Sequence, residues 1–411
     1  MATTGVVGQH WRAAVTATGS VEPWDGSPVL DWFVAADDRW HDPRSDTGVR
    51  HRRVDGTAVL ETKVRIPGGD AVQRVWSVAD AGGFTLVEIA NDSPMPMACV
   101  FTRPDLVANR PPARVPIEGI EVPVGSLLLP VGHRSSVVVG LPHGGVGDGV
   151  GREGARLPKG LAGPDAVARG WRARTEHASR LDLPDLALSE AVRAARCEVL
   201  LTGADDPDDD PERFLLAVAE LVRMAEIDPR DAASLAPEVA DAVAAVAPGS
   251  SPLAGAALAA AGVVLAAAGE TRARRDLAAI VGRTEGVGLR PAADGSDGAD
   301  PASGNWAPDD IATVAAVEGR LARGPELFPA GLPSGWRGID FEAHGLVVGP
   351  VSRLSLAVRW HGSNAAVLWE LDGDPVTLHS TLGQGWHTDE RTGEALWVMA
   401  DADARFSDRC S

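Results

Sequence analysis

The chain has 411 residues, of which 38 are basic and 57 acidic, so its formal net charge is -19. This charge repels phosphate backbones and anionic lipid heads, and we therefore expect neither nucleic acid nor a membrane as a partner. Hydrophobic residues make up 45% of the chain, which excludes global disorder, and the length suits two or three domains.

The N-terminal region, residues 1–150, has the pattern of an antiparallel β-sandwich. Apolar and charged side chains alternate over residues 60–66 (LETKVRI), which is the period of a half-buried strand. A Pro-Gly-Gly-Asp turn follows, and further turn signals come about every ten residues, as in sandwich folds. The next segment, 151–163, is predicted to be a Gly-rich linker. The GVGREG run at 149–154 matches a dinucleotide-binding pattern, but it lacks the flanking strand and helix that such a site needs.

Residues 164–324 are predicted to be all α-helical, in seven stretches. The clearest stretch covers 211–227, where Asp210 is the expected N-cap and Pro211 lies in the first turn. Its apolar residues form one stripe, so Glu220 and Arg223 are expected to face water. The other stretches lie near 165–180, 186–201, 231–247, 252–269, 271–283 and 308–323.

The stretch 252–269 contains no charge over 18 residues, which is near the lower length limit for a membrane span. It is dominated by Ala and Gly, which transfer poorly into lipid. Ser251 followed by Pro252 is a typical start of a helix in water-soluble proteins. We therefore expect a buried helix rather than a membrane span.

The C-terminal region, residues 325–411, returns to strand patterns and is predicted to form an antiparallel β-sheet. Strands are expected near 353–360, 367–371, 376–382 and 394–400. This sheet either forms a separate domain or completes the first sandwich. The predicted fold class is thus multidomain α+β: an N-terminal sandwich, a central helical-hairpin region resembling a partial α/α toroid, and a C-terminal sheet.

The N-terminus, MATTGVVGQHW, has neither a basic start nor an apolar h-region, so no secretory signal is expected. The cysteines Cys99, Cys197 and Cys410 are too few and too far apart for a disulfide framework or a zinc knuckle. We expect a cytoplasmic protein with no metal and no cofactor.

Tryptophan and carboxylate residues come together at the junction of helices and C-terminal strands. Sugars are bound by flat aromatic faces and by carboxylates, and glycosidic cleavage needs one protonated and one ionised carboxylate. The candidate catalytic residues are therefore Asp309, Asp310, Asp340 and Glu342, and the candidate substrate-binding residues are Trp306, Trp336, His361 and His387. In the alternative interpretation, Asp309 caps a helix, Asp340 and Glu342 solvate a strand face, and the tryptophans belong to the core.

The run VLDWF at 29–33, ahead of DDRW at 37–40, resembles the opening of glucoamylase/trehalase-like glycoside hydrolases. The run LETKV at 60–64, ahead of Gly68, Gly69 and Val72, is similar to a later strand pair of their sandwich. The resemblance implies a β-sandwich, a linker and an (α/α)₆ toroid of paired helices, acting on an α-glucan-type saccharide. It covers about 60 residues by motif and the rest by architecture.

Length argues for a shortened relative of that family. Twelve helices of about 11 residues with short connections need roughly 180–200 residues, and 164–324 contains 161. The family's catalytic glutamate motifs have no counterpart among the predicted helices, so no catalytic residue is carried over from the resemblance.

Two classes of function stay open at this point. The first is a carbohydrate-related protein of glycoside-hydrolase ancestry that hydrolyses or binds a saccharide. The second is a non-catalytic glycan- or protein-binding module or scaffold with a degenerate site. The Ala-rich helices also make a homo-oligomer possible.

Overall fold

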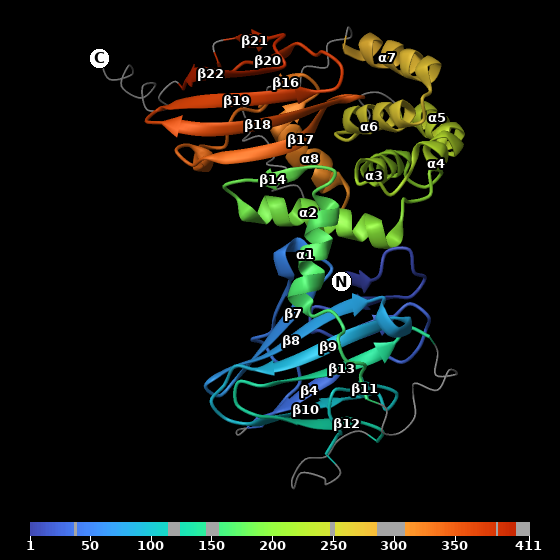
Figure 1. The fold of residues 1–411 in the computed structure, drawn as a ribbon, viewed down its shortest axis with the longest axis vertical. Helices are drawn as coiled ribbons and strands as arrows, with labels where there is room; N and C mark the ends of the chain where they lie inside the picture. The colour runs from blue at the N-terminus through green and yellow to red at the C-terminus, as the bar shows by residue number, and fades with distance from the viewer. Residues whose placement is uncertain are drawn as a thin grey trace. The chain divides into compact units, whose positions relative to one another are not determined.

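A computed structural model describes residues 1–36, 39–113, 124–144, 156–246, 251–285, 309–383 and 385–399. The chain divides into two compact units, Met1–Ala173 and Arg174–Ser411. The fold is mixed α+β with several antiparallel sheets, as the sequence predicts at that level (Figure 1). Residues 151–155 of the predicted linker and the C-terminal residues 400–411 lie outside the described residues, whereas 156–163 are described.

The first unit is built from three antiparallel sheets. A three-stranded sheet consists of β1 (Ala2–Gly5), β2 (Arg12–Val15) and β3 (Val21–Pro23). A four-stranded sheet has the order β12 (Leu127–Val131), β10 (Met97–Phe101), β4 (Trp32–Ala35) and β5 (Trp40–His41). A six-stranded sheet has the order β11 (Val107–Ala108), β13 (Ser136–Pro142), β9 (Phe84–Asn91), β8 (Gly69–Val78), β7 (Leu60–Ile66) and β6 (Arg50–Arg53).

All three sheets contribute to one core in this unit, with Val15, Trp32 and Val87 among its fully buried members. A second cluster joins Trp76 and Phe84 to Ala168 of α1 (Pro164–Thr175). The strand expected at 60–66 is confirmed as β7, and the turn that follows it leads into β8 in register Ile66 to Gly69.

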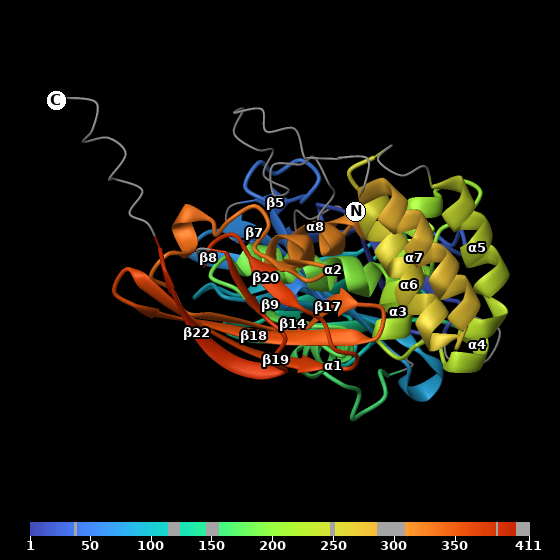
Figure 2. The ribbon, with the colours of Figure 1, turned by 90° about the horizontal axis from the view of Figure 1, so that it is seen from above.

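Helices begin the second unit and strands end it. The helices are α2 (Leu186–Thr202), α3 (Pro211–Arg223), α4 (Pro229–Ser234), α5 (Ala236–Ala245), α6 (Ala254–Ala267), α7 (Thr271–Glu285) and α8 (Ala312–Leu321). Figure 2 shows α3 to α7 grouped beside the strands of this unit. Two predicted boundaries are wrong: α3 ends at Arg223 because Ala225 has a left-handed φ of 62°, and the stretch 231–247 is two helices, since Pro237 starts the second.

Two sheets complete this unit. The larger one, sheet D, has the order β14 (Arg180–Asp182), β17 (Phe341–Gly349), β18 (Ser352–His361), β19 (Asn364–Asp372) and β22 (Thr392–Val398), all antiparallel. The smaller one, sheet E, has the order β15 (Ala322–Arg323), β16 (Glu326–Leu327), β20 (Leu378–Ser380) and β21 (Trp386–Thr388). Strand β14 was not expected, because three residues between two helices carry no visible alternation.

Helices and strands of the second unit share one core. Val314 and Leu321 of α8 belong to the same buried cluster as Leu354, Val358 and Trp369 of sheet D. The boundary that the sequence predicts at residue 324 therefore falls within a continuous core.

Helix α6 is the uncharged stretch that raised the question of a membrane span. It is buried on most of its surface, and the Ser251 hydroxyl accepts hydrogen bonds from the N–H groups of Leu253 and Ala254. The prediction of a buried helix is confirmed, but the helix begins at Ala254 with Leu253 as its N-cap, so Ser251 precedes the predicted cap position instead of occupying it. Among the described residues, no helix combines the length and apolarity that crossing a bilayer requires.

Candidate functional site

The two aspartates ahead of α8 lie at the helix start. The Asp310 carboxylate accepts a hydrogen bond from the N–H of Ala312 at 2.9 Å. It also pairs with Arg213 of α3 through two contacts of 3.2 and 2.8 Å, so its charge is neutralised by a bidentate guanidinium. Asp309 is half-buried beside it, and Trp306 lies outside the described residues. This geometry matches a capping and tethering role for Asp310.

Asp340 and Glu342 lie at the start of β17 and point to the same side of sheet D, because side chains alternate along a strand. The Asp340 carboxylate accepts a hydrogen bond from the N–H of Trp360 on the neighbouring strand at 2.9 Å. Glu342 is held by Arg359, by His344 at 3.1 Å and by Arg180 at 3.5 Å. Hydrogen bonds from His344 and then from Arg359 lower the pKa of Glu342, so it is ionised at neutral pH.

The remaining described candidates, Trp336, His361 and His387, lie in different places. Trp336 is 5% exposed and packs edge-on against Phe341, with ring centroids 5.2 Å apart, so it is part of the core. His361 is exposed at the end of β18. His387 is exposed on β21 of sheet E, directly opposite His379. The structure thus brings Asp340, Glu342 and His361 to one sheet, and places the other described candidates elsewhere.

The solvent-facing side of sheet D, called the outer face below, carries Asp340, Glu342 and Arg359 on and beside β17 and β18, and a mixture of aliphatic and acidic side chains on β19 and β22. The exposed aliphatic side chains are Leu368, Leu396 and Val398, which are 37%, 59% and 56% exposed. Leu396 and Val398 lie on the same face of β22, and Leu368 of β19 lies opposite Glu394 and diagonal to Leu396 in the strand register. Three large aliphatic side chains together on one open sheet face are typical of a docking surface.

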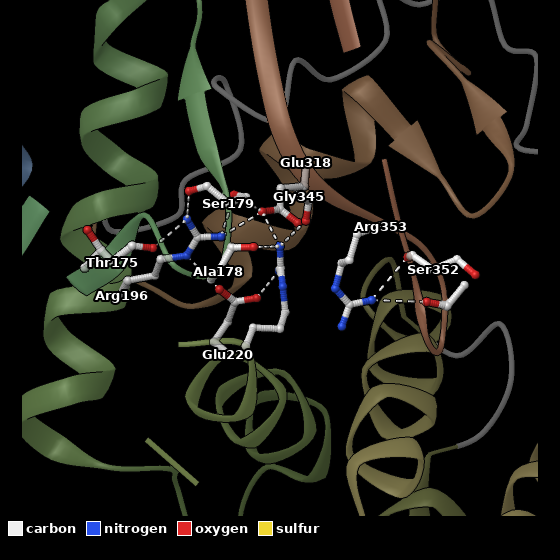
Figure 3. Close-up of polar contacts among 11 residues, drawn as sticks. Thr175, Ala178, Ser179, Arg196, Glu220, Glu318, Gly345, Ser352 and Arg353 are labelled. Carbon is white, nitrogen blue, oxygen red and sulfur yellow. Dashed lines mark hydrogen bonds and ion pairs between the residues drawn. The ribbon is translucent and has the colours of Figure 1, made fainter. Parts of the chain in front are cut away.

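A cluster of buried charges in the second unit was missed by sequence reasoning (Figure 3). Arg196 of α2 donates to Glu220 of α3 at 2.7 Å and to Glu318 of α8 at 2.7 Å. Its other N–H groups donate to the Ser179 hydroxyl and carbonyl at 2.9 Å and to the Thr175 carbonyl at 3.4 Å. All five donors of this guanidinium therefore have partners.

Arg223 completes the cluster from the end of α3. It pairs with Glu220 one turn earlier and with Glu318 at 2.9 Å, and it donates to the carbonyls of Ala178 and Gly345. The side chains of Arg196, Arg223, Glu220 and Glu318 are 2%, 4%, 6% and 11% exposed. Two cations thus balance two anions inside the protein.

The buried cluster keeps Glu318 ionised. Burial alone would raise the pKa of Glu318, but Arg223 and then Arg196 outweigh burial and lower that pKa to about 2. A carboxyl group with such a pKa does not donate a proton at neutral pH. The cluster therefore joins α2, α3, α8 and sheet D, and Glu318 does not serve in it as a general acid.

The expectation that Glu220 and Arg223 face water is wrong. The polar side of α3 lies against α2 and α8, which bring Arg196 and Glu318 to it. The only local signal is the spacing of Glu220 and Arg223 by three residues, and this spacing is also common on exposed helices. Their long-range partners are 24 and 95 residues away in sequence.

A small recess lies beside the cluster, lined by Thr175, Glu176, Ser179, Leu181, Ser189, Val192, Arg193 and Arg196. Its volume of about 10 Å³ is enough for about one water molecule. Ligand sites for small molecules are usually about 300–1,000 Å³. This recess is therefore too small to hold a sugar.

Two comparisons with known proteins found no relative of this chain. No protein-family model matches the chain, and no curated protein matches it significantly.

Proposed function

We propose that the chain is a non-catalytic binding protein that docks a protein partner through the outer face of sheet D. We further propose that it descends from glucoamylase/trehalase-like glycoside hydrolases. The ancestry rests on the VLDWF and LETKV motifs, and the order of a β-rich unit, helices and a further sheet supports it. The N-terminal sheets represent the sandwich of that family in this proposal, and the helices of the second unit represent a shortened toroid.

The single observation that carries the loss of catalysis is the engagement of Asp310 and Glu342, two of the four candidate carboxylates, by cations. Glycoside hydrolysis needs one carboxyl group with a raised pKa as acid and a second, ionised one across the bond. Asp310 is clamped by Arg213 and Glu342 by Arg359. The pKa of Glu342 is lowered, which is the opposite of what a general acid needs.

The composition of the outer face supports a protein ligand over a sugar. Protein interfaces have an apolar centre and a polar rim, which matches Leu368, Leu396 and Val398 beside charged side chains. Sugar platforms rely on exposed aromatic rings, whereas the outward positions of the described strands of sheet D carry no Trp or Phe side chain.

The charges on the outer face indicate which kind of protein partner would bind there. Acidic residues outnumber basic ones on the outer face, with Asp182, Asp340, Glu342, Glu370 and Glu394 against Arg180 and Arg359. A second copy of the chain would bring like charges together, in addition to the net charge of -19 on each chain. The partner expected here is a protein surface with an apolar centre and a basic rim.

Site-specific crosslinking tests this proposal. A photo-crosslinking amino acid placed at position 396 should yield one defined protein adduct in cells that express the chain. The same group at position 186, where Leu186 is 72% exposed on α2, is the matched control and should not yield it. The purified partner should then bind the wild type less tightly as salt is raised, and should bind the Leu396→Glu variant at least about tenfold more weakly.

Two outcomes would contradict the proposal. Equal adducts from positions 396 and 186, or none from 396, would remove the outer face as the docking surface. Release of sugar from α-glucans or trehalose by the purified wild type, lost in the Glu342→Gln variant, would restore the hydrolase interpretation of the site.

A further inference from the structure

Sheet E presents two histidines side by side on its exposed surface. His379 of β20 and His387 of β21 are direct partners in the antiparallel register, with Leu378 opposite Thr388 and Ser380 opposite Trp386. Both histidines are exposed, while Leu378 and Ser380 point into the core. The two imidazoles therefore project from the same side of the same strand pair.

The hydrogen-bond pattern shows that this is a close pair. The N–H of His379 donates to the Pro325 carbonyl at 3.1 Å, on the side of β16. The N–H and C=O of one strand residue point to the same side, so neither of these groups of His379 faces β21. His379 and His387 therefore form a non-hydrogen-bonded pair, in which the Cα atoms are about 4.5 Å apart and side chains approach most closely.

The ring nitrogens of the two histidines indicate a function for the pair, which is metal binding. Nδ1 of His387 lies 3.4 Å from the Gly385 carbonyl, and donation from Nδ1–H orients the ring and leaves Nε2 as the free lone pair. Two imidazoles on adjacent strands suit borderline-soft divalent metals. We propose that His379 and His387 together chelate one divalent transition-metal ion of the Zn²⁺ type at the surface of sheet E.

The site needs only these two protein ligands. Among the described residues, no three His, Cys, Asp or Glu side chains gather closely enough to hold a metal ion, so water completes the coordination. Open coordination positions distinguish such a site from a closed structural zinc site.

Metal titration of the full chain without a polyhistidine tag tests the proposal. Isothermal titration with Zn²⁺ should give one site per chain. His379→Ala and His387→Ala should each weaken binding by about tenfold or more, because losing a ligand costs at least as much as losing its supporting partner. His361→Ala removes an exposed histidine from sheet D and should leave binding unchanged.

A spectroscopic measurement separates chelation by the pair from binding by single histidines. With Cu²⁺ as the probe, electron paramagnetic resonance should show coupling to two imidazole nitrogens in the wild type and to one in either single variant. Unchanged Zn²⁺ affinity in both alanine variants, or a two-nitrogen spectrum that survives in them, would overturn the assignment. The far-UV circular dichroism of each variant should match the wild type, since both side chains are exposed.

Discussion

At the scale of single residues, the second unit is organised by the buried charges of Arg196, Arg223, Glu220 and Glu318. Such a cluster stabilises a fold only when every member is present, because each charge removed leaves another one buried without compensation. Arg196 and Arg223 each contact both glutamates, and Arg196 also holds the segment around Ser179 through that residue's hydroxyl and carbonyl. The position of Arg196 explains why a polar side chain is fully buried in α2.

Replacing Arg196 tests that role. Arg196→Met keeps the volume but leaves Glu220 and Glu318 with one cation, so unfolding free energy should fall by about 3–5 kcal/mol. Arg180→Met is the control, because Arg180 is 47% exposed in its ion pairs and such surface pairs contribute about 0–1 kcal/mol. Urea unfolding at pH 7 measures both. Similar losses in the two variants would mean that the buried cluster adds nothing beyond a surface ion pair.

Two half-buried histidines make the first unit sensitive to mild acid. Burial, and then repulsion from Arg53, lowers the pKa of His51 to about 4, and burial lowers the pKa of His143 to about 4. The unfolded chain protonates near the ordinary pKa of 6.5. The stabilisation from neutral histidine is therefore present above pH 6.5 and is lost as the pH falls toward 4.

The prediction is a loss of stability of the first unit between pH 6.5 and 4. The His51→Gln/His143→Gln double variant should lose less over that range, because glutamine does not titrate. Urea unfolding midpoints at half-unit pH steps provide the measurement, and ring proton shifts in NMR give the two pKa values. A steeper pH dependence in the double variant, or ring titration near 6.5, would contradict this account.

At the scale of secondary-structure elements, alternation in the sequence was a reliable guide only where one face of a strand meets water. It predicted β7 and the long strands β18 and β19, and burial alternates along most of β18 and along β19 from Val367 onward. It was misleading at Glu61, which is 2% exposed although it occupies a polar position of β7. Arg52 and Arg74 on the neighbouring strands cover and neutralise it. Such coverage depends on cross-strand partners that local periodicity does not contain.

Glycines offer a test of how tightly these elements pack. A Cβ added to Gly319 in α8 meets nothing within 4 Å, whereas a Cβ on Gly393 of β22 would lie 2.4 Å from the Trp369 ring. Gly319→Ala should stabilise the protein by up to about 1 kcal/mol through helix propensity. Gly393→Ala should destabilise it by about 1–3 kcal/mol through overpacking. Thermal unfolding of both variants checks the signs, and a stabilising Gly393→Ala would refute the close contact with Trp369.

At the scale of the whole molecule, the sequence predicted an α+β chain with β-rich ends and a helical middle, since these follow from periodicity. It did not predict that α8 and sheet D share a core, because Leu321 and Val358 meet only through tertiary packing. The cation partners of the candidate carboxylates were missed for a related reason. Asp310 and Glu342 were chosen by their nearness to tryptophans in sequence, while their partners Arg213 and Arg359 are set by the fold. Pairing with distant cations is invisible in a single sequence.

Separate cores in the two units lead to a last prediction about fragments. In the first unit, the Trp76 indole donates to the Ala162 carbonyl at 2.9 Å and packs in one cluster with Ala168 of α1. A fragment of residues 1–175 keeps this segment and should unfold in one cooperative transition. A fragment of residues 1–155 exposes Trp76 and Phe84, so its unfolding free energy should be lower by about 2–4 kcal/mol. Tryptophan fluorescence during urea unfolding compares them. Equal midpoints would show that α1 contributes nothing to the first unit, and a 1–175 fragment without a cooperative transition would show that its core is not sufficient alone.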